Sequence, residues 1–244
     1  MPSFSSQTSE PIEPDTLRVL ITGFGPFSGY TQNPSWLAVR RLHNTTTTVK
    51  TQSASTPPTL LRSASQDLLS TRRVHITTLE VPVTYQAVLS TVPGFHTRPP
   101  TLPPVDDATL VSIPPPTEGY DFIFHVGVAG RGPIRVETLA HKLGYRMKDV
   151  EGQYAPIVHL SDEDEKNVLV SGNTQSNDLR IGVDRDEGVE PSNHEPIRGF
   201  GKGYEGFANS LCTDLDVSRL IAHLKESGIE MRVTFCVTSF TIVL

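Results

Sequence analysis

The sequence predicts an α/β fold in which helices sandwich a mainly parallel β-sheet. Strand-like apolar runs recur along the chain, amphipathic helical patterns alternate with them, and such alternation favours a parallel sheet covered by helices. The expected strands are residues 17–23, 74–83, 121–128 and 231–237. With 244 residues, of which 36% are hydrophobic, we expect one α/β domain over residues 16–244, preceded by a disordered arm, residues 1–15.

The composition excludes several classes of protein. The formal net charge is -6 and Lys and Arg form no cluster, which argues against nucleic acid as a partner. No apolar run approaches the roughly 20 residues that span a bilayer, and the N-terminal residues lack the pattern of a secretion signal. Two cysteines, Cys212 and Cys236, form no disulfide framework and fit a reducing compartment. We expect a soluble, cytoplasmic protein that contacts no membrane.

Helix signals flank the expected strands. Asn33 fits an N-cap and Pro34 the first helical position, so the pattern predicts a helix over residues 33–42, and a second helix is expected from Tyr85. After Asp214 the chain shows one apolar helical face and a glycine stop, formed by Val217, Leu220, Ile221, Leu224 and Gly228.

Two segments read as surface insertions without chemistry. Residues 45–66 are poor in apolar side chains that could pack, which indicates a flexible, low-complexity insertion. Residues 96–117 are rich in proline, which removes backbone donors and forbids a regular helix.

The segment 120–145 joins an apolar strand, a glycine-rich turn and a helical pattern that carries an acid, Glu137. The apolar spacing predicts a helix that starts near Pro133 and ends at Gly144, with one buried face made by Val136, Leu139, Ala140 and Leu143. Ligands of open α/β sheets bind beyond the carboxyl ends of strands, so Glu137 is the first candidate for a site. By pattern alone, an acid at such a position is more often a solvated helix residue.

The turn Gly23–Gly29, GFGPFSG, follows a strand and invites comparison with a phosphate-binding loop. Pro26 follows the second glycine and the third glycine has the wrong spacing, so nucleotide binding is disfavoured. Phe24 and Phe27 can instead wall an apolar pocket for a small flat ligand. In the alternative reading, both rings pack under the loop.

Other reactive side chains have ordinary structural explanations. Glu137 and His141 have the spacing of a metal pair or an exposed ion pair, but no third His or Cys stands near, so no metal or other cofactor is expected. His125 lies within a strand and fits a hydrogen-bonded core histidine. Cys236 lies in a β-branched run and fits a small buried hydrophobe.

Five segments, spread over about residues 17–234, carry a family resemblance: VLITGFGPFSG, NPS at Asn33 to Ser35, VPVTYQAV, FHVGVAG and RVETLAHKLGY. In this order and spacing they resemble pyroglutamyl peptidase type I, a family of cytosolic cysteine peptidases. The resemblance implies a three-layer α/β/α sandwich of the phosphorylase/hydrolase-like kind. It also implies removal of an N-terminal pyroglutamyl residue from peptides by a Glu, Cys, His triad in that chain order.

The resemblance assigns roles to individual residues. Glu137 matches the triad acid, Phe24 and Phe27 match the two rings that hold the lactam, and Met147 falls near a further apolar pocket position. A neutral, flat lactam offers little charge, so aromatic faces and backbone hydrogen bonds must select it. In such a triad the thiolate attacks the carbonyl, the imidazole moves the proton, and the acid orients the imidazole.

The nucleophile and the base are not found where the resemblance implies them. Counted from Thr234, the nucleophile position falls near residues 242–244 or beyond, so Cys236 comes too early. No histidine follows His223, which lies on a helix where the family places no catalytic residue. The chain ends in an apolar, β-branched run typical of aggregation-prone segments. We expect a C-terminally incomplete, truncated member that at most binds pyroglutamyl termini; the alternative is an active thiol protease that recruits Cys236.

Overall fold

A computed structural model of the chain describes residues 12–13, 15–27, 29–51, 70–105, 107–128, 134–159, 196–229 and 231–234. The chain divides into two compact units. Unit 1 comprises Met1–Gly25, Tyr30–Pro82 and Ser90–Val126, and unit 2 comprises Pro26–Gly29, Val83–Leu89 and Gly127–Leu244. That residues 16–244 form a single domain stays a prediction.

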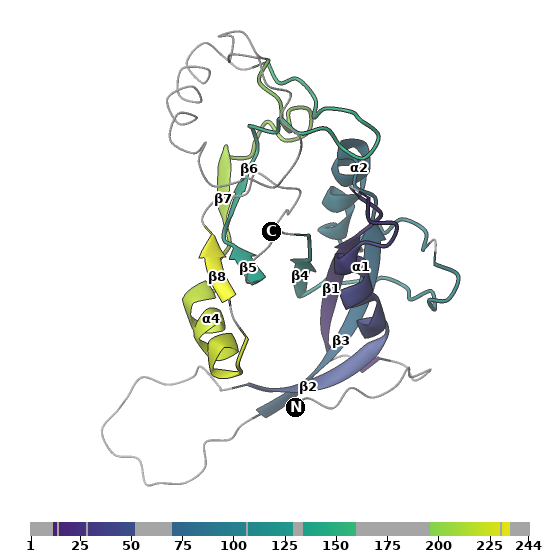
Figure 1. Cartoon of the computed structure of the whole chain (residues 1–244). Coiled ribbons are helices and arrows are strands. Elements are labelled where there is room, and N and C mark those ends of the chain that lie inside the picture. Colours follow the sequence, from purple (N-terminus) through teal and green to yellow (C-terminus); the bar gives the residue numbers. More distant parts are fainter. Residues whose placement is uncertain are drawn as a thin grey trace. The chain divides into compact units, whose positions relative to one another are not determined.

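Unit 1 is built on a four-stranded sheet of order β2-β3-β1-β4. The central strand β1 (Leu17–Phe24) pairs in parallel with β3 (Ser70–Val81) on one side and with β4 (Phe122–His125) on the other (Figure 1). Leu20 is fully buried and Phe24 lies opposite Val81 in register. The strands predicted at residues 17–23, 74–83 and 121–128 are therefore confirmed as β1, β3 and β4, and the α/β class is confirmed with them.

The fourth strand, β2 (Thr45–Thr51), corrects the flexible insertion expected from residue 45. It pairs antiparallel with β3, from Thr45 opposite Ile76 to Thr51 opposite Ser70. Its threonines and valine are β-branched and suit an edge strand, which needs only one partner and can be polar on its outer side. The rest of the expected insertion, residues 52–66, lies outside the described residues.

The first helix begins as predicted. In α1 (Pro34–Val39), the N-cap Asn33 accepts a hydrogen bond from the Ser35 N–H, and a 3-10 turn, η1 (Arg40–Leu42), continues the helix. Trp36 and Val39 are buried, and α1 packs against β1, whereas Leu37 is 40% exposed. Trp36 and Val39 therefore form the apolar side of α1.

The second helix, α2 (Tyr85–Phe95), also begins at its predicted residue. The proline-rich residues 96–105 and 107–117 that follow contain no helix or strand, as expected. This segment turns tightly past the end of α2, because the Thr101 N–H donates to the Gly94 carbonyl at 2.8 Å. A Cβ at Gly94 would lie 2.7 Å from the Thr101 carbonyl oxygen, so the close approach requires glycine.

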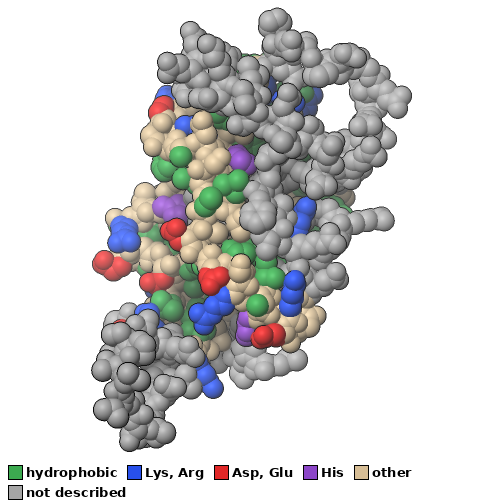
Figure 2. Space-filling view, turned by 90° about the vertical axis from the view of Figure 1, so that its left-hand side faces the viewer, with side chains coloured by type: hydrophobic (Ala, Val, Ile, Leu, Met, Phe, Trp, Pro, Cys, Tyr) green, Lys and Arg blue, Asp and Glu red, His purple; other side chains and the backbone are tan. Residues whose placement is uncertain are grey.

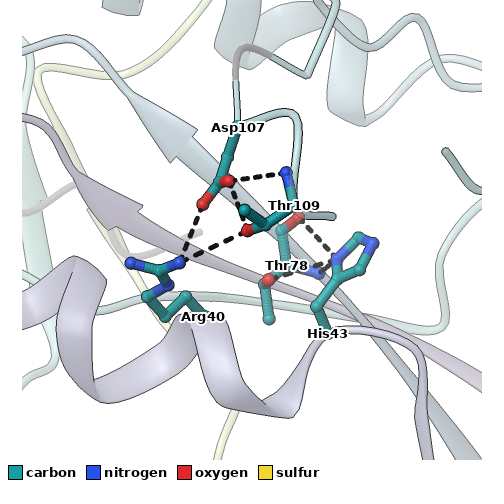
Figure 3. Close-up of polar contacts among 5 residues, drawn as sticks. All are labelled: Arg40, His43, Thr78, Asp107 and Thr109. Atoms are coloured by element: carbon teal, nitrogen blue, oxygen red, sulfur yellow. Dashed lines mark hydrogen bonds and ion pairs between the residues drawn. The ribbon is translucent and has the colours of Figure 1, made fainter. Parts of the chain in front are cut away.

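Polar contacts attach the proline-rich segment to η1 and β3 (Figure 3). Arg40 forms an ion pair with Asp107 at 3.1 Å, and Asp107 accepts hydrogen bonds from the Thr109 N–H and hydroxyl. Buried His43 accepts from the Thr78 N–H through Nδ1 at 3.1 Å, and its Nε2 lies 2.8 Å from a carbonyl oxygen of the segment. Because Nδ1 accepts, Nε2 carries the proton of the neutral ring and donates to that carbonyl.

Unit 2 contains two small pairs of strands. β5 (Ile134–Glu137) pairs in parallel with β8 (Met231–Thr234), and β6 (Leu139–His141) pairs antiparallel with β7 (Ser210–Cys212). The helix predicted from Pro133 to Gly144 is therefore wrong. The partner strands lie about 70 to 100 residues away in sequence, and pairing with them overrides the local helical pattern.

The helix α4 (Val217–Glu226) confirms the C-terminal helix prediction. Its N-cap is Asp216, which accepts a hydrogen bond from the Arg219 N–H at 3.0 Å, and it ends before Gly228, whose φ is +81°. Val217 and Ile221 are buried against Val136 of β5, with Leu220 and Leu224 partly buried beside them. The predicted apolar face is thus the face that packs.

Figure 2 presents one face of the molecule with its side chains coloured by type. On the described part of this face, basic and acidic side chains are interspersed, and hydrophobic side chains lie in small separate groups. Among the described residues, no helix is long and apolar enough to cross a bilayer.

Candidate functional site

Hydrogen bonds from the start of α1 hold the turn that follows β1. The Phe24 N–H donates to the Ser35 hydroxyl at 3.0 Å, and the Asn33 amide donates to the Gly25 carbonyl at 2.8 Å. The Asn33 side-chain oxygen accepts from both the N–H and the hydroxyl of Ser35, at 3.0 and 2.8 Å. Asn33 and Ser35 are buried, so the NPS motif fixes the backbone of the GFG turn rather than binding a ligand itself.

Gly23 serves helix packing. A Cβ at this position would lie 2.7 Å from the Trp36 Cα and 2.8 Å from its backbone nitrogen. The glycine therefore lets α1 approach β1, and it does not open a helix as a nucleotide-binding loop would, because α1 starts only at Pro34. The disfavoured nucleotide reading gains no support from this geometry.

The two phenylalanines of the turn differ in exposure. Phe24 ends β1 in unit 1 and is 6% exposed, whereas Phe27 belongs to unit 2 and is half-buried. The buried ring of Phe24 packs as the alternative reading expects for that residue. Phe27 leaves ring surface that a flat ligand can contact.

Glu137 lies on a strand, not on a helix. It ends β5 and is the register partner of Thr234, which ends the described part of the parallel strand β8. Its Oε2 atom is buried and has no hydrogen-bond partner among the described residues. Burial raises the pKa of this carboxyl, and nearby Arg135 opposes that shift. An acid with an unsatisfied oxygen at the carboxyl end of parallel strands is the position where α/β proteins hold functional groups.

The strand geometry also removes the predicted relation between Glu137 and His141. The two residues are on separate strands, β5 and β6, and do not share a helix face. The Nδ1 atom of His141 lies 3.0 Å from the Ser210 hydroxyl of β7, and burial lowers the pKa of His141. No group of three or more His, Cys, Asp or Glu side chains among the described residues could hold a metal ion.

Met147, the further pocket residue expected from the resemblance, lies in a loop of unit 2 and is 47% exposed. Its carbonyl accepts a hydrogen bond from the Tyr85 hydroxyl at 2.8 Å. Asp149, two residues later, is buried and accepts from the N–H of Tyr85, the first residue of α2. Sequence reasoning missed Asp149, although an Asp three residues before a glycine is a signal of a side-chain-closed turn.

The other candidate residues of the sequence analysis are histidines and cysteines. His125 on β4 is buried, its Nδ1 is 2.7 Å from the Thr22 hydroxyl, and burial, followed by the charge of His96, lowers its pKa to about 4. His223 is exposed on α4, and Cys212 is a free, exposed cysteine on β7. Cys236 lies outside the described residues. The core reading of His125 is therefore confirmed.

A comparison with protein families supports the resemblance seen in the sequence. Residues 17–89 match the family described as pyroglutamyl peptidase. This segment includes the GFGPF turn, the NPS motif and the start of α2. The chain therefore resembles the pyroglutamyl peptidases, and the match spans β1 to the first residues of α2. Among curated proteins, none matches the chain.

Solved structures similar to this chain include pyroglutamyl peptidase I from Bacillus amyloliquefaciens, with 21% identity and a TM-score of 0.46, over 90% of this chain and 66% of that one. The pyrrolidone carboxyl peptidase of Fervidobacterium islandicum AW-1 has 20% identity and a TM-score of 0.48, over 91% and 66%. A Pyrococcus furiosus pyrrolidone carboxyl peptidase mutant has 16% identity and a TM-score of 0.46, over 90% and 65%. The matches thus span just under two thirds of those chains.

Proposed function

We propose that this chain, which resembles the pyroglutamyl peptidases, recognises peptides that begin with a pyroglutamyl residue. The family match over residues 17–89 is the observation that carries this proposal. In that segment buried Asn33 and Ser35 form hydrogen bonds with the backbone of Phe24 and Gly25, at the start of the turn that also carries Phe27. A rigid turn with aromatic side chains suits a flat neutral ring, because little ordering is left to occur when the ligand binds.

In the proposed site, Phe27 and Met147 of unit 2 contact the lactam and Glu137 of the same unit is the acid, whereas Phe24, whose ring is buried, supports the turn. The exposure of Met147 and the partial exposure of Phe27 support their roles, since both residues leave some apolar surface accessible to a ligand. The unsatisfied oxygen of Glu137 supports its role as the acid, because a triad acid needs a free oxygen to accept an imidazole N–H.

We further propose that these 244 residues bind such peptides without hydrolysing them efficiently. Among them no histidine follows His223, and the cysteines are Cys212, which is exposed, and Cys236. Neither cysteine is at the position that the family resemblance implies. A carboxylate alone cannot cut an amide, because the reaction needs a nucleophile and a base that transfers its proton. Loss of a triad nucleophile typically leaves about 10³- to 10⁴-fold acceleration over water from binding and oxyanion effects.

The alternative is an active thiol protease in which Cys236 has become the nucleophile. The two readings separate in an assay of amine release from a chromogenic pyroglutamyl anilide, with Cys236→Ala and Cys212→Ala as matched variants. Turnover that Cys236→Ala abolishes and Cys212→Ala preserves would establish the protease. Absence of turnover, with binding of the lactam intact, supports the binding function.

Binding is measured with 2-pyrrolidone, the bare lactam, which has no peptide bond to cut. Cyclopentanone, which has the same ring and carbonyl but no N–H, is the control ligand. We expect 2-pyrrolidone to bind more tightly, and Phe27→Ala to weaken it. Equal affinity for both ligands would contradict lactam recognition. A cytoplasmic location, as expected from composition and cysteine content, belongs to the same proposal.

A further inference from the structure

The loop that carries Met147 is closed by a buried carboxylate. Asp149 is 7% exposed, and its Oδ1 accepts hydrogen bonds from the N–H groups of Glu151 and Gln153, at 3.0 and 2.8 Å. The Asp149 N–H in turn donates to the Gln153 carbonyl at 2.8 Å. Gly152 adopts a φ of +76°, which a side chain would disfavour. The loop is therefore an ordered turn with its own internal hydrogen bonds.

The same carboxylate docks this turn onto α2. Its Oδ2 accepts from the N–H of Tyr85, the first residue of the helix, at 3.1 Å. An anion is favourable at this place, because the first N–H groups of a helix have no partner within the helix and carry a partial positive charge. The Val150 N–H adds a second attachment by donating to the Val83 carbonyl at 3.2 Å.

Tyr85 provides the contact that reaches Met147 itself. Its hydroxyl donates to the Met147 carbonyl at 2.8 Å, and its ring is buried edge-on against Tyr145, with 6.0 Å between centroids. Burial, and then the charge of Asp149, raises the pKa of Tyr85 to about 12, so the hydroxyl stays protonated and remains a donor at neutral pH.

The result is a fixed backbone with an exposed side chain. The carbonyl of Met147 is bonded, whereas the residue as a whole is 47% exposed. A thioether presented from an ordered turn can form an apolar wall of a site.

We infer that Tyr85 and Asp149 are positioning residues that hold Met147 as one wall of the lactam site. This inference rests on the proposed function, and it adds the residues that determine where that wall lies. Neither side chain touches the ligand. Asp149 docks the turn on α2, and Tyr85 sets the position of the Met147 carbonyl, so both act on specificity through Met147.

The chain offers a direct probe of this arrangement, because its three methionines are Met1, Met147 and Met231. Methyl-¹³C labelling of methionine gives three signals, and Met147→Leu identifies the one from Met147. The test variant is Tyr85→Phe, which removes the hydroxyl and keeps the ring. Tyr204→Phe is the matched control, since Tyr204 belongs to the same group of packed rings and its hydroxyl has no hydrogen bond among the described residues.

In the protein without ligand, Tyr85→Phe should shift or broaden the Met147 signal while Tyr204→Phe leaves it in place. In titrations with 2-pyrrolidone, Tyr85→Phe should raise the dissociation constant about 3- to 10-fold, as expected for loss of one buried hydrogen bond, with no change for the control. Asp149→Asn should act in the same direction. Thermal unfolding checks that each variant is folded.

The outcomes separate the two proposals. If wild-type protein binds 2-pyrrolidone and Tyr85→Phe alters neither the Met147 signal nor the affinity, the positioning role is overturned and lactam recognition stands. If wild-type protein shows no response to 2-pyrrolidone, lactam recognition itself is overturned, and the assignment of Met147 to a lactam wall falls with it.

Discussion

Glu137 and Thr234 are register partners at the ends of two parallel strands, β5 and β8. Parallel strands end at the same edge of a sheet, so Thr234 lies beside the acid at that edge. The family resemblance implies a nucleophile after the strand at residues 231–234, and that strand ends at the same edge as Glu137. The acid is thus at the place where α/β proteins assemble a site from several strands.

The buried carboxyl of Glu137 should cost the protein stability at high pH. Its pKa is raised by burial, so the ionised form is less favourable in the folded chain than in the unfolded chain. Full stability is therefore present below the ordinary Glu pKa of about 4.3 and is lost as the pH rises through the higher pKa of the folded state. Glu137→Gln should be stabilising at pH 8 relative to its effect at pH 4, as measured by urea unfolding.

For this test the control is Glu118→Gln, at an exposed residue just after the proline-rich segment. The control should show no such dependence on pH. A Glu137→Gln effect that is the same at both pH values would mean that the carboxyl is not desolvated.

Substitution by alanine should lower the free energy of unfolding at Gly23 and leave it almost unchanged at Gly25. Gly23→Ala places a Cβ 2.7 Å from the Trp36 Cα. The backbone of α1 would have to move to relieve this clash, so we expect a loss of about 2 kcal/mol or more in the free energy of unfolding. At Gly25 the nearest atom would be 3.6 Å away, an ordinary contact. Gly25→Ala should stay within about 0.5 kcal/mol of wild type. Chemical denaturation decides, and equal losses for the two variants would refute the packing role of Gly23.

Asn33 should be the residue on which the aromatic turn depends most. Asn33→Ala removes the helix cap and the bond to the Gly25 carbonyl, with an expected cost of about 2 kcal/mol. Asn33→Asp keeps the capping oxygen but places a second acceptor against the Gly25 carbonyl, so it should keep the cap of α1 and lose the bond to the turn. Hydrogen exchange at the Ser35 N–H should be faster in Asn33→Ala than in Asn33→Asp. Identical exchange rates would mean that the side chain does not cap α1.

His125 should make the protein sensitive to mild acid. Burial lowers its pKa to about 4, so the folded state holds it neutral. Stability is full above the ordinary histidine pKa of about 6.5 and falls as the pH drops toward 4, by on the order of 3 kcal/mol. His125→Gln should flatten the pH dependence of the unfolding free energy in this window. Burial also lowers the pKa of His75 to about 4, so His75 should still contribute to the pH dependence of stability in the His125→Gln variant.

Exposed His223 supplies the comparison for that experiment. His223→Gln should leave the pH dependence unchanged. If the His125 and His223 variants have the same pH profile, the burial of His125 has no energetic consequence.

Sequence patterns predicted the elements whose signals are local. Asn33 and Pro34 start α1, Gly228 follows the end of α4, and the apolar runs of β1 and β4 have no competing helical period. The helix predicted over residues 134–141 was wrong because their apolar spacing fits a helix as well as strands. The β-branched Ile134, Val136 and Thr138 alternate, which was the available strand signal, but the deciding contact is with β8, far along the chain.

Features made by contacts between distant segments stayed outside the reach of sequence reasoning. The polar strand β2 exists because β3 pairs with it. Asp149 is important because its carboxylate reaches the start of α2, 64 residues earlier. The pattern identified Glu137, Phe27 and Met147 as candidates, whereas the hydrogen bonds that position Met147 became visible only in the fold.

The central claim is that these 244 residues hold a pyroglutamyl terminus without cutting it. Equilibrium dialysis of a pyroglutamyl p-nitroanilide tests it most directly, because one experiment reads both bound substrate and released p-nitroaniline. The account predicts intact substrate retained by the protein, with less retained by Phe27→Ala. Steady release of p-nitroaniline that disappears in Cys236→Ala would contradict it.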